Sequence, residues 1–129
     1  MAEKRTMNKY KNKYPFKLAV PSFIYPADYE TNIEKLGPHF DEIELLFMEK
    51  NPGSLPDEDL VERLLGLSEK HDITYNIHTP TDLDPGSYHR RTRQEAVDTL
   101  TELIDITKPL PVTSYTVHLP LNTNDFSEP

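Results

Sequence analysis

The stretch Thr74-Tyr75-Asn76-Ile77-His78-Thr79-Pro80 recurs at positions 114–120 as Ser114-Tyr115-Thr116-Val117-His118-Leu119-Pro120. Tyrosine, histidine and proline occupy the same places in both copies. Each copy predicts a short strand of β-branched and aromatic residues that ends at a proline, which cannot donate to a strand ladder. Each copy therefore places one histidine within the last residue or two of a strand.

The remainder of the chain alternates strand-like and helix-like segments around these two copies. Short apolar runs predict strands, and apolar residues at helical spacing predict helices. Asp28 is the expected N-cap of the first helix, and Gly37-Pro38 its expected end. The expected strands cover 17–23, 42–47, 74–80 and 114–120, and the expected helices cover about 28–36, 55–71 and 88–107.

This alternation is typical of an α/β fold with parallel strands and right-handed crossovers. Such a sheet is either open or one half of a closed barrel, and a barrel needs about eight units and about 250 residues. We expect the N-terminal half of a (β/α) barrel, with about four strands and three helices. Residues 1–14, rich in lysine and poor in apolar side chains, are expected to form a flexible basic tail, and 15–129 an incomplete half-barrel domain.

Composition excludes several classes of function. The chain has no cysteine, which removes disulfides, thiol nucleophiles and cysteine-ligated metals. A net charge of −8, from 22 acidic and 14 basic residues, argues against a general nucleic-acid binder. No apolar run approaches the roughly 20 residues of a membrane span, and no apolar segment follows the basic N-terminus as in a secretory signal. We expect a cytoplasmic protein.

The two histidines are the first candidates for chemistry, because ligands bind beyond the carboxyl ends of parallel strands. Strand alternation puts Asn76 with His78, and Thr116 with His118, on one side of the sheet. Two imidazoles on adjacent strand ends predict a shared divalent metal ion, for which zinc and manganese are the candidates. The alternative is that each histidine is a hydrogen-bonded structural residue.

Four further residues are candidates for the same site. Glu44 lies inside an otherwise apolar strand, where an unpaired carboxylate would be costly, so it is either a salt-bridged structural acid or a catalytic residue. Ser22 and Tyr25 end the first strand, where they can line the same opening, and Asn76 shares the side of His78. We therefore expect Ser22, Tyr25 and Asn76 to contact substrate.

The strand-end histidines His78 and His118, following the acidic strand at 42–45, resemble those of the xylose-isomerase-like TIM barrels, a superfamily that includes the family 2 AP endonucleases. This superfamily contains sugar isomerases and epimerases and endonuclease-IV-type phosphodiesterases. Its members generally hold divalent metals at the barrel mouth with His, Glu and Asp side chains. The resemblance implies that His78 and His118 are metal ligands and that Glu44 is a barrel-facing acid, our candidate catalytic residue.

A closer resemblance, from Tyr14 to about Leu121, is to the cobamide-remodelling phosphodiesterases. It is carried by the stretches 14–18, 24–28, 42–49, 55–57, 71–78 and 107–110. Members of that family hydrolyse the phosphodiester in the nucleotide loop of cobamides such as cobalamin. The resemblance implies metal-assisted hydrolysis, and it also implies that a second half of the barrel supplies further ligands. We therefore expect this chain to be the N-terminal part of a larger enzyme.

Three functional hypotheses remain. The first is a metal-dependent phosphodiesterase acting on a cobamide, and the second is an isomerase or epimerase acting on a sugar or sugar phosphate. The third is a non-catalytic half-barrel that binds a ligand or pairs with another subunit, as a homodimer or with a separate C-terminal half. In the first two hypotheses the protein acts on a small molecule, and neither hypothesis requires a nucleic acid or a membrane.

Overall fold

A computed structural model describes residues 7–120, over which strands and helices alternate along the whole segment. The four strands are parallel and adjacent in chain order, β1-β2-β3-β4, so the fold is α/β with four parallel strands and three helices. The elements are β1 (Ala19–Pro21), α1 (Tyr29–Leu36), β2 (Glu42–Leu46), α2 (Glu58–His71), β3 (Thr74–His78), α3 (Arg90–Thr107) and β4 (Val112–Thr116). The predicted order of elements is confirmed.

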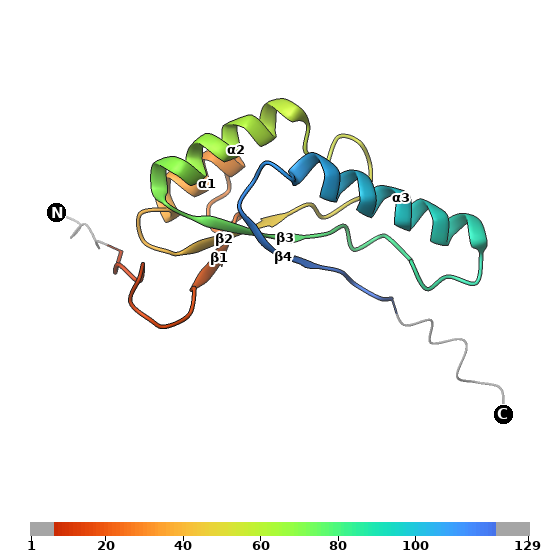
Figure 1. The fold of residues 1–129 in the computed structure, drawn as a ribbon, viewed down its shortest axis with the longest axis horizontal. Coiled ribbons are helices and arrows are strands. Elements are labelled where there is room, and N and C mark those ends of the chain that lie inside the picture. Colours follow the sequence, from red (N-terminus) through yellow and green to blue (C-terminus); the bar gives the residue numbers. More distant parts are fainter. Residues whose placement is uncertain (1–6, 121–129) are drawn as a thin grey trace.

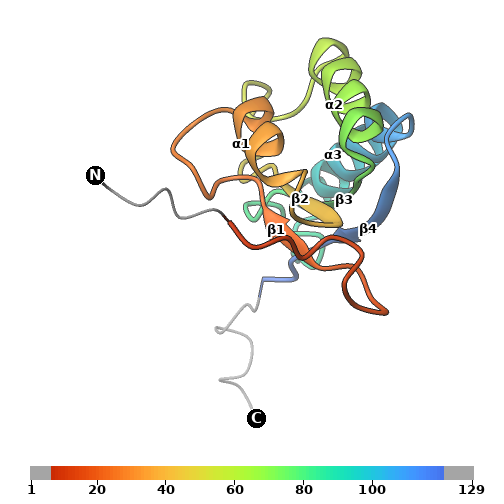
Figure 2. The same ribbon diagram turned by 90° about the vertical axis from the view of Figure 1, so that its left-hand side faces the viewer.

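All three helices cover the same face of the sheet, and the other face is left open (Figures 1 and 2). This one-sided arrangement is consistent with one half of an α/β barrel, whose helices would form the outer ring and whose open face would line the interior. None of the helices described between residues 7 and 120 is both long and apolar enough to cross a bilayer.

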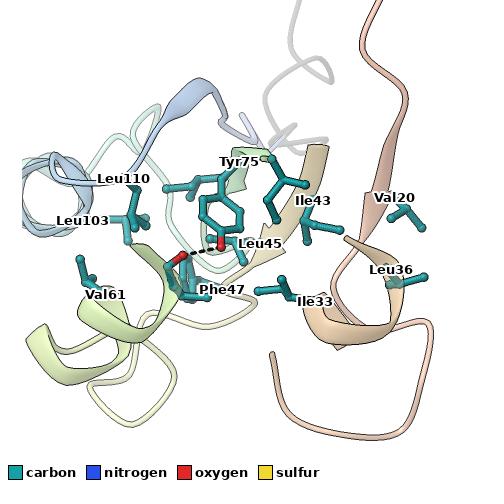
Figure 3. Packing of buried hydrophobic residues seen from close by; sticks show 13 residues of the cluster. Val20, Ile33, Leu36, Ile43, Leu45, Phe47, Val61, Tyr75, Leu103 and Leu110 are labelled. Carbon is teal, nitrogen blue, oxygen red and sulfur yellow. Dashed lines mark hydrogen bonds between the residues drawn. The ribbon is translucent and has the colours of Figure 1, made fainter. Parts of the chain in front are cut away.

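The core fills the space between the covered face and the helices. In β3, Tyr75 and Ile77 are fully buried, whereas the residues that alternate with them, Thr74, Asn76 and His78, are only partly buried. The ring of Tyr75 lies in the middle of the cluster, and its hydroxyl donates to the carbonyl of Leu64 in α2 at 2.6 Å (Figure 3). Burial raises the pKa of this hydroxyl, so it remains a hydrogen-bond donor throughout the physiological range.

All four strands differ in their bounds from those expected: β2 ends at Leu46 and β3 at His78, each earlier than predicted. Strand β1 has three residues and ends at Pro21, which has no N–H to extend the ladder. The fourth strand was expected at 114–120, but β4 runs from Val112 to Thr116, so His118 lies two residues beyond it. The ladder stops there because Pro80 has no N–H and because Thr81 donates its N–H to Met48, on the β2 side.

Helix starts also differ slightly. Asp28 caps α1 as expected, accepting a hydrogen bond from the N–H of Thr31 at 2.7 Å. Helix α2 begins at Glu58, because the carboxylate of Asp57 accepts from the N–H of Leu60 at 2.8 Å and so occupies the N-cap position. Helix α3 begins at Arg90, without a side-chain cap.

Residues 7–14 make specific contacts, in contrast to the flexible tail expected over 1–14. The ammonium of Lys11 donates to the carbonyls of Gly37, Phe40 and His71, at the ends of α1 and α2. Asp41, which precedes β2, accepts from the backbone N–H of Asn12 at 2.7 Å and of Leu18 at 2.9 Å. The segment is thus fastened beneath the amino ends of the strands. Residues 1–6 and 121–129 lie outside the described residues.

We refer to the two bonds from Asn12 and Leu18 to Asp41 as the Asp41 clamp. Burial pushes the pKa of the Asp41 carboxyl upward, but the two backbone N–H groups and the nearby Lys11 outweigh it, and the pKa lies below its usual value. The clamp therefore stabilises the fold above the pKa that Asp41 has in the unfolded chain. Its contribution is lost as the pH falls through the folded-state pKa.

Replacing Asp41 with alanine is expected to lower the free energy of unfolding at neutral pH by about 1–3 kcal/mol, because two N–H groups lose their acceptor. Urea unfolding of the wild type and Asp41→Ala measures this difference. The difference should shrink as the pH is lowered below about 4, where the clamp is lost from the wild type as well. Asp98→Ala, on the exposed surface of α3, is the control and should change the unfolding free energy by less than about 0.5 kcal/mol. Equal losses in the two variants would contradict the clamp.

Candidate functional site

His78 and His118 come together at the carboxyl ends of β3 and β4. Their Nε2 atoms are 2.9 Å apart, and their rings lie 4.8 Å apart at a tilt of 48°. His78 is the last residue of β3, on the open face, because the alternating Tyr75 and Ile77 point into the core. The predicted convergence of the two histidines is therefore present in the structure.

The approach of His118 is set by the pairing of β3 with β4. Thr116 is the register partner of His78, so the two residues after it carry the chain past the end of β3. Thr79 fixes this end of the pairing, since both its N–H and its hydroxyl donate to the carbonyl of Thr116, at 3.0 and 2.8 Å. Thr79 is itself buried, so the anchor is shielded from water.

The facing nitrogens allow two chemical states. Either one Nε2 carries a proton and donates to the other, or both direct lone pairs at a shared cation. With metal–nitrogen bonds of about 2.0–2.1 Å, a separation of 2.9 Å corresponds to an angle of about 90° at the shared ion. The two imidazoles thus fit two adjacent positions in the coordination sphere of a divalent ion.

The structure does not complete a metal site from residues 7–120. Within that range no group of three or more His, Asp or Glu side chains is placed to hold a metal. Nδ1 of His78 is also buried with no hydrogen-bond partner among the described residues, whereas a ligating histidine usually donates from its second nitrogen. The donor set fits two ligands of a metal centre, and the other coordination positions need donors from elsewhere.

Glu44 lies on the open face of β2, two residues before Leu46, which is the register partner of His78. Its own partners in the neighbouring strands are Pro21 and Asn76. It is partly exposed, and it does not form a three-residue ligand group with the histidine pair. Glu44 therefore shares the face of the site without being a ligand in this arrangement.

Asn76 also lies on the open face, but its amide is already engaged. Its Nδ2 donates to the carboxylate of Glu42 at 2.9 Å, toward the amino end of the sheet and away from His78. Sequence reasoning placed Asn76 on the correct side of the sheet. It did not identify the acid that Asn76 binds.

Ser22 and Tyr25 were expected at the opening near the histidines, and only Ser22 lies at the strand ends. Ser22 follows the last residue of β1, donating its N–H to the backbone carbonyl of Glu44 and accepting from the N–H of Leu46 through Oγ at 3.3 Å. The ring of Tyr25 instead lies beneath the ammonium of Lys35, 4.4 Å from its centroid, against α1. The turn at Tyr25 is held by Asn32, which bonds both the N–H and the carbonyl of Tyr25.

Sequence reasoning missed the role of Glu42. This buried carboxylate accepts hydrogen bonds from Thr74 at 2.7 Å, Asn76 at 2.9 Å and Thr113 at 2.6 Å, so it links β2, β3 and β4 across the open face. Burial alone would raise its pKa, but these three bonds and the positive charge of Lys17 outweigh burial, and the pKa lies below its usual value. The signal in the sequence was that residues 42, 74, 76 and 113, in three successive strands, are all polar.

Comparison with known proteins identifies the fold but no family. No protein-family model matches the chain, and no curated protein matches it. A chain from the solved structure "The crystal structure of AsfvAP:AG" is similar, with a TM-score of 0.53 and 19% identity. The match covers 71% of this chain and 30% of that one. At this level of identity the similarity shows the fold alone, and the match extends over less than a third of the other chain.

A zinc titration followed by calorimetry tests the histidine pair. We expect His78→Ala and His118→Ala each to weaken zinc binding by at least about tenfold, because each removes one imidazole ligand. His89→Ala, at an exposed histidine immediately before α3, is the matched control and should bind zinc as the wild type does. If the pair is only a structural hydrogen bond, both site variants will lose stability but retain the wild-type affinity for zinc.

Proposed function

We propose that the chain supplies part of the active site of a metal-dependent phosphodiester hydrolase, of the kind that acts on the nucleotide loop of cobamides. The observation that carries the proposal is the convergence of two Nε2 atoms at the carboxyl ends of adjacent parallel strands. That edge of a parallel sheet is where α/β folds place their ligands. The resemblance of the sequence to the cobamide-remodelling phosphodiesterases selects the substrate.

We also propose that the four strands form half of a TIM barrel of the xylose-isomerase-like type. Two features support this proposal. Helices cover only one face of the sheet, and the uncovered face carries the polar network around Glu42. A polar face of this kind suits the interior of a barrel whose opening holds a charged substrate. The similar solved chain, much longer than the match, is consistent with further elements beyond these four strands.

In such a site a bound divalent ion would supply an activated water and neutralise charge on the phosphoryl oxygens. His78 and His118 would hold it through Nε2, and Thr79 would keep the two strand ends in register. Hydrolysis adds the water oxygen to phosphorus, breaks one P–O ester bond and transfers one proton to the leaving oxygen. Glu44, the acid that shares the open face with no hydrogen bond from its own neighbours in the described part of the chain, is our candidate to accept the proton of the water.

Phosphorus NMR tests the proposal without requiring turnover. With Mn²⁺ bound to the chain, the phosphodiester resonance of cobalamin should broaden, because a paramagnetic ion relaxes a phosphorus nucleus that lies close to it. The double variant His78→Ala/His118→Ala should abolish the broadening, and His89→Ala should preserve it. Equal broadening in the wild type and the double variant would rule out the histidine pair as the site.

The same samples separate the hydrolase from the isomerase hypothesis. Release of the lower-ligand nucleoside from cobalamin, followed by chromatography, would support a phosphodiesterase. Conversion of a keto-sugar phosphate in the same buffer, without cleavage of cobalamin, would support an isomerase. A functional role for Glu44 requires that Glu44→Gln lowers the turnover that is seen and leaves the Mn²⁺-dependent broadening unchanged.

A second candidate function is association with another subunit, and the exposed side of β4 favours it. Ser114 and Thr116 of β4 are exposed, Val117 just after it is 44% exposed, and β4 forms one edge of the described sheet. An unprotected edge strand is a surface on which another strand can pair. A second copy would bring a second histidine pair to the same assembly.

Sedimentation velocity over a range of concentrations tests association. We expect the wild type to form dimers and Val117→Lys to weaken dimer formation by at least about tenfold, because lysine at an edge strand opposes pairing. Val97→Lys, which replaces a valine 51% exposed on α3, is the matched control and should dimerise as the wild type does. A wild type that stays monomeric at every concentration would exclude self-association.

A further inference from the structure

An apolar cavity of about 520 Å³ opens at the carboxyl ends of β1 and β2. It lies between the segment that follows β1, the first turn of α1 and the end of β2. Its walls include Phe23, Tyr29, Leu46 and Met48. A volume of this size falls in the range of about 300–1,000 Å³ that is typical of pockets for small molecules.

The polar groups in the walls are already paired within the protein. The hydroxyl of Tyr29 donates to the carbonyl of Leu46 at 2.6 Å, and Oγ of Ser22 accepts from the N–H of Leu46. The carboxylate of Asp28 is the N-cap acceptor of α1. A ligand in the cavity therefore meets apolar surface and one committed negative charge, which favours an uncharged apolar group over an anion.

The apolar side chains at the rim suit an aromatic ring. Phe23 is 61% exposed and Met48 is 50% exposed, one after β1 and the other after β2, and both line the cavity. Exposed large apolar side chains gathered at one hollow often mark a binding site. Phenylalanine stacks with aromatic rings, and the methionine thioether makes favourable contacts with them, so these two residues together prefer a planar ring to an alkyl group.

The cavity and the histidine pair belong to neighbouring strands, β2 and β3. Leu46 lines the cavity, and it is also the register partner of His78 in the parallel ladder. Neighbouring strands lie about 4.7–4.9 Å apart. The cavity and the histidine pair therefore lie at the carboxyl ends of adjacent strands, on the same edge of the sheet.

We propose that this cavity binds an uncharged planar aromatic ring. The position of the phosphate rests on the proposed function, whereas the ring site rests on the cavity alone. Ring and phosphate are thus recognised by different residues. Phe23 and Met48 select the ring, and the histidine pair selects the phosphate through its metal.

Indole binding tests the ring site directly. The chain contains no tryptophan, so the fluorescence of added indole can be excited without interference from the protein. We expect saturable indole binding that is weakened about tenfold by Phe23→Ser and by Met48→Ser, because each removes one apolar wall. Both side chains are at least half exposed, so neither substitution should prevent folding, and circular dichroism checks this.

Phe16→Ser is the matched control for Phe23→Ser. Phe16 is 60% exposed and stacks on Tyr14, away from the cavity, so its replacement should leave indole binding unchanged. Cyclohexanol, which is uncharged but not aromatic, should compete with indole at least about tenfold more weakly than benzimidazole does. Equal competition by cyclohexanol, or equal indole binding by the wild type and Phe23→Ser, would overturn the proposal.

The double variant His78→Ala/His118→Ala separates the ring site from the proposed function. It should bind indole as the wild type does and lose the Mn²⁺-dependent broadening of the cobalamin phosphorus signal. Phe23→Ser should retain metal binding and weaken indole binding about tenfold. If the double histidine variant lost indole binding and Phe23→Ser kept it, the ring would lie at the histidines, and the cavity would be refuted as its site.

Discussion

The two-residue alternation of β3 is the constraint on which both the core and the candidate site depend. Tyr75 and Ile77 must point at the helices, since they are the buried apolar side chains of β3. The residues between and after them are then forced onto the open face. A shift of one residue in register would exchange the two sets, exposing Tyr75 and burying His78. The histidine thus owes its position to the packing of its neighbours.

The register of β3 against β4 determines the position of the second histidine, His118. This register contains an irregularity. Pairing shifts between Tyr75 and Asn76, so Thr113 stands opposite no single partner and Ser114 pairs with Asn76. The extra residue lets the hydroxyl of Thr113 reach Glu42, two strands away. It also sets how far the chain extends past the end of β3, which determines where His118 meets His78. Such bulges re-aim side chains near functional sites.

Much of the fold could be predicted from the sequence, because its main signals are local. The order of strands and helices follows from apolar periodicity, and Asp28 was recognisable as a cap from its place before a helical pattern. The histidine pair was predictable because two similar strand ends in a parallel sheet must meet at one edge. The similar sequences around His78 and His118 nevertheless concealed a difference. His78 is inside its strand, and His118 lies beyond one.

What could not be predicted depends on contacts between distant segments. The sequence around Lys11 resembles a charged tail. Its ammonium donates to three carbonyls at the ends of α1 and α2, and these come together only in the folded chain. The place of Tyr25 depends in the same way on Lys35 and Asn32. In α3, Val97 and Ile104 are apolar but exposed, whereas Ala96 and Leu103 are buried, a difference that helical spacing alone does not predict.

The open face holds two kinds of polar side chain. Their hydrogen bonds distinguish residues that join the strands from residues that are candidates to bind a ligand. Glu42 accepts three hydrogen bonds from its own sheet, so its charge is already balanced and it serves to join strands. His78 has one nitrogen facing another imidazole and one buried without a partner in the described chain. A buried polar atom without a partner costs free energy, which folding alone gives no reason to accept. On the open face, a ligand is therefore to be sought at the Nε2 of His78 that faces His118, and not at the engaged carboxylate of Glu42.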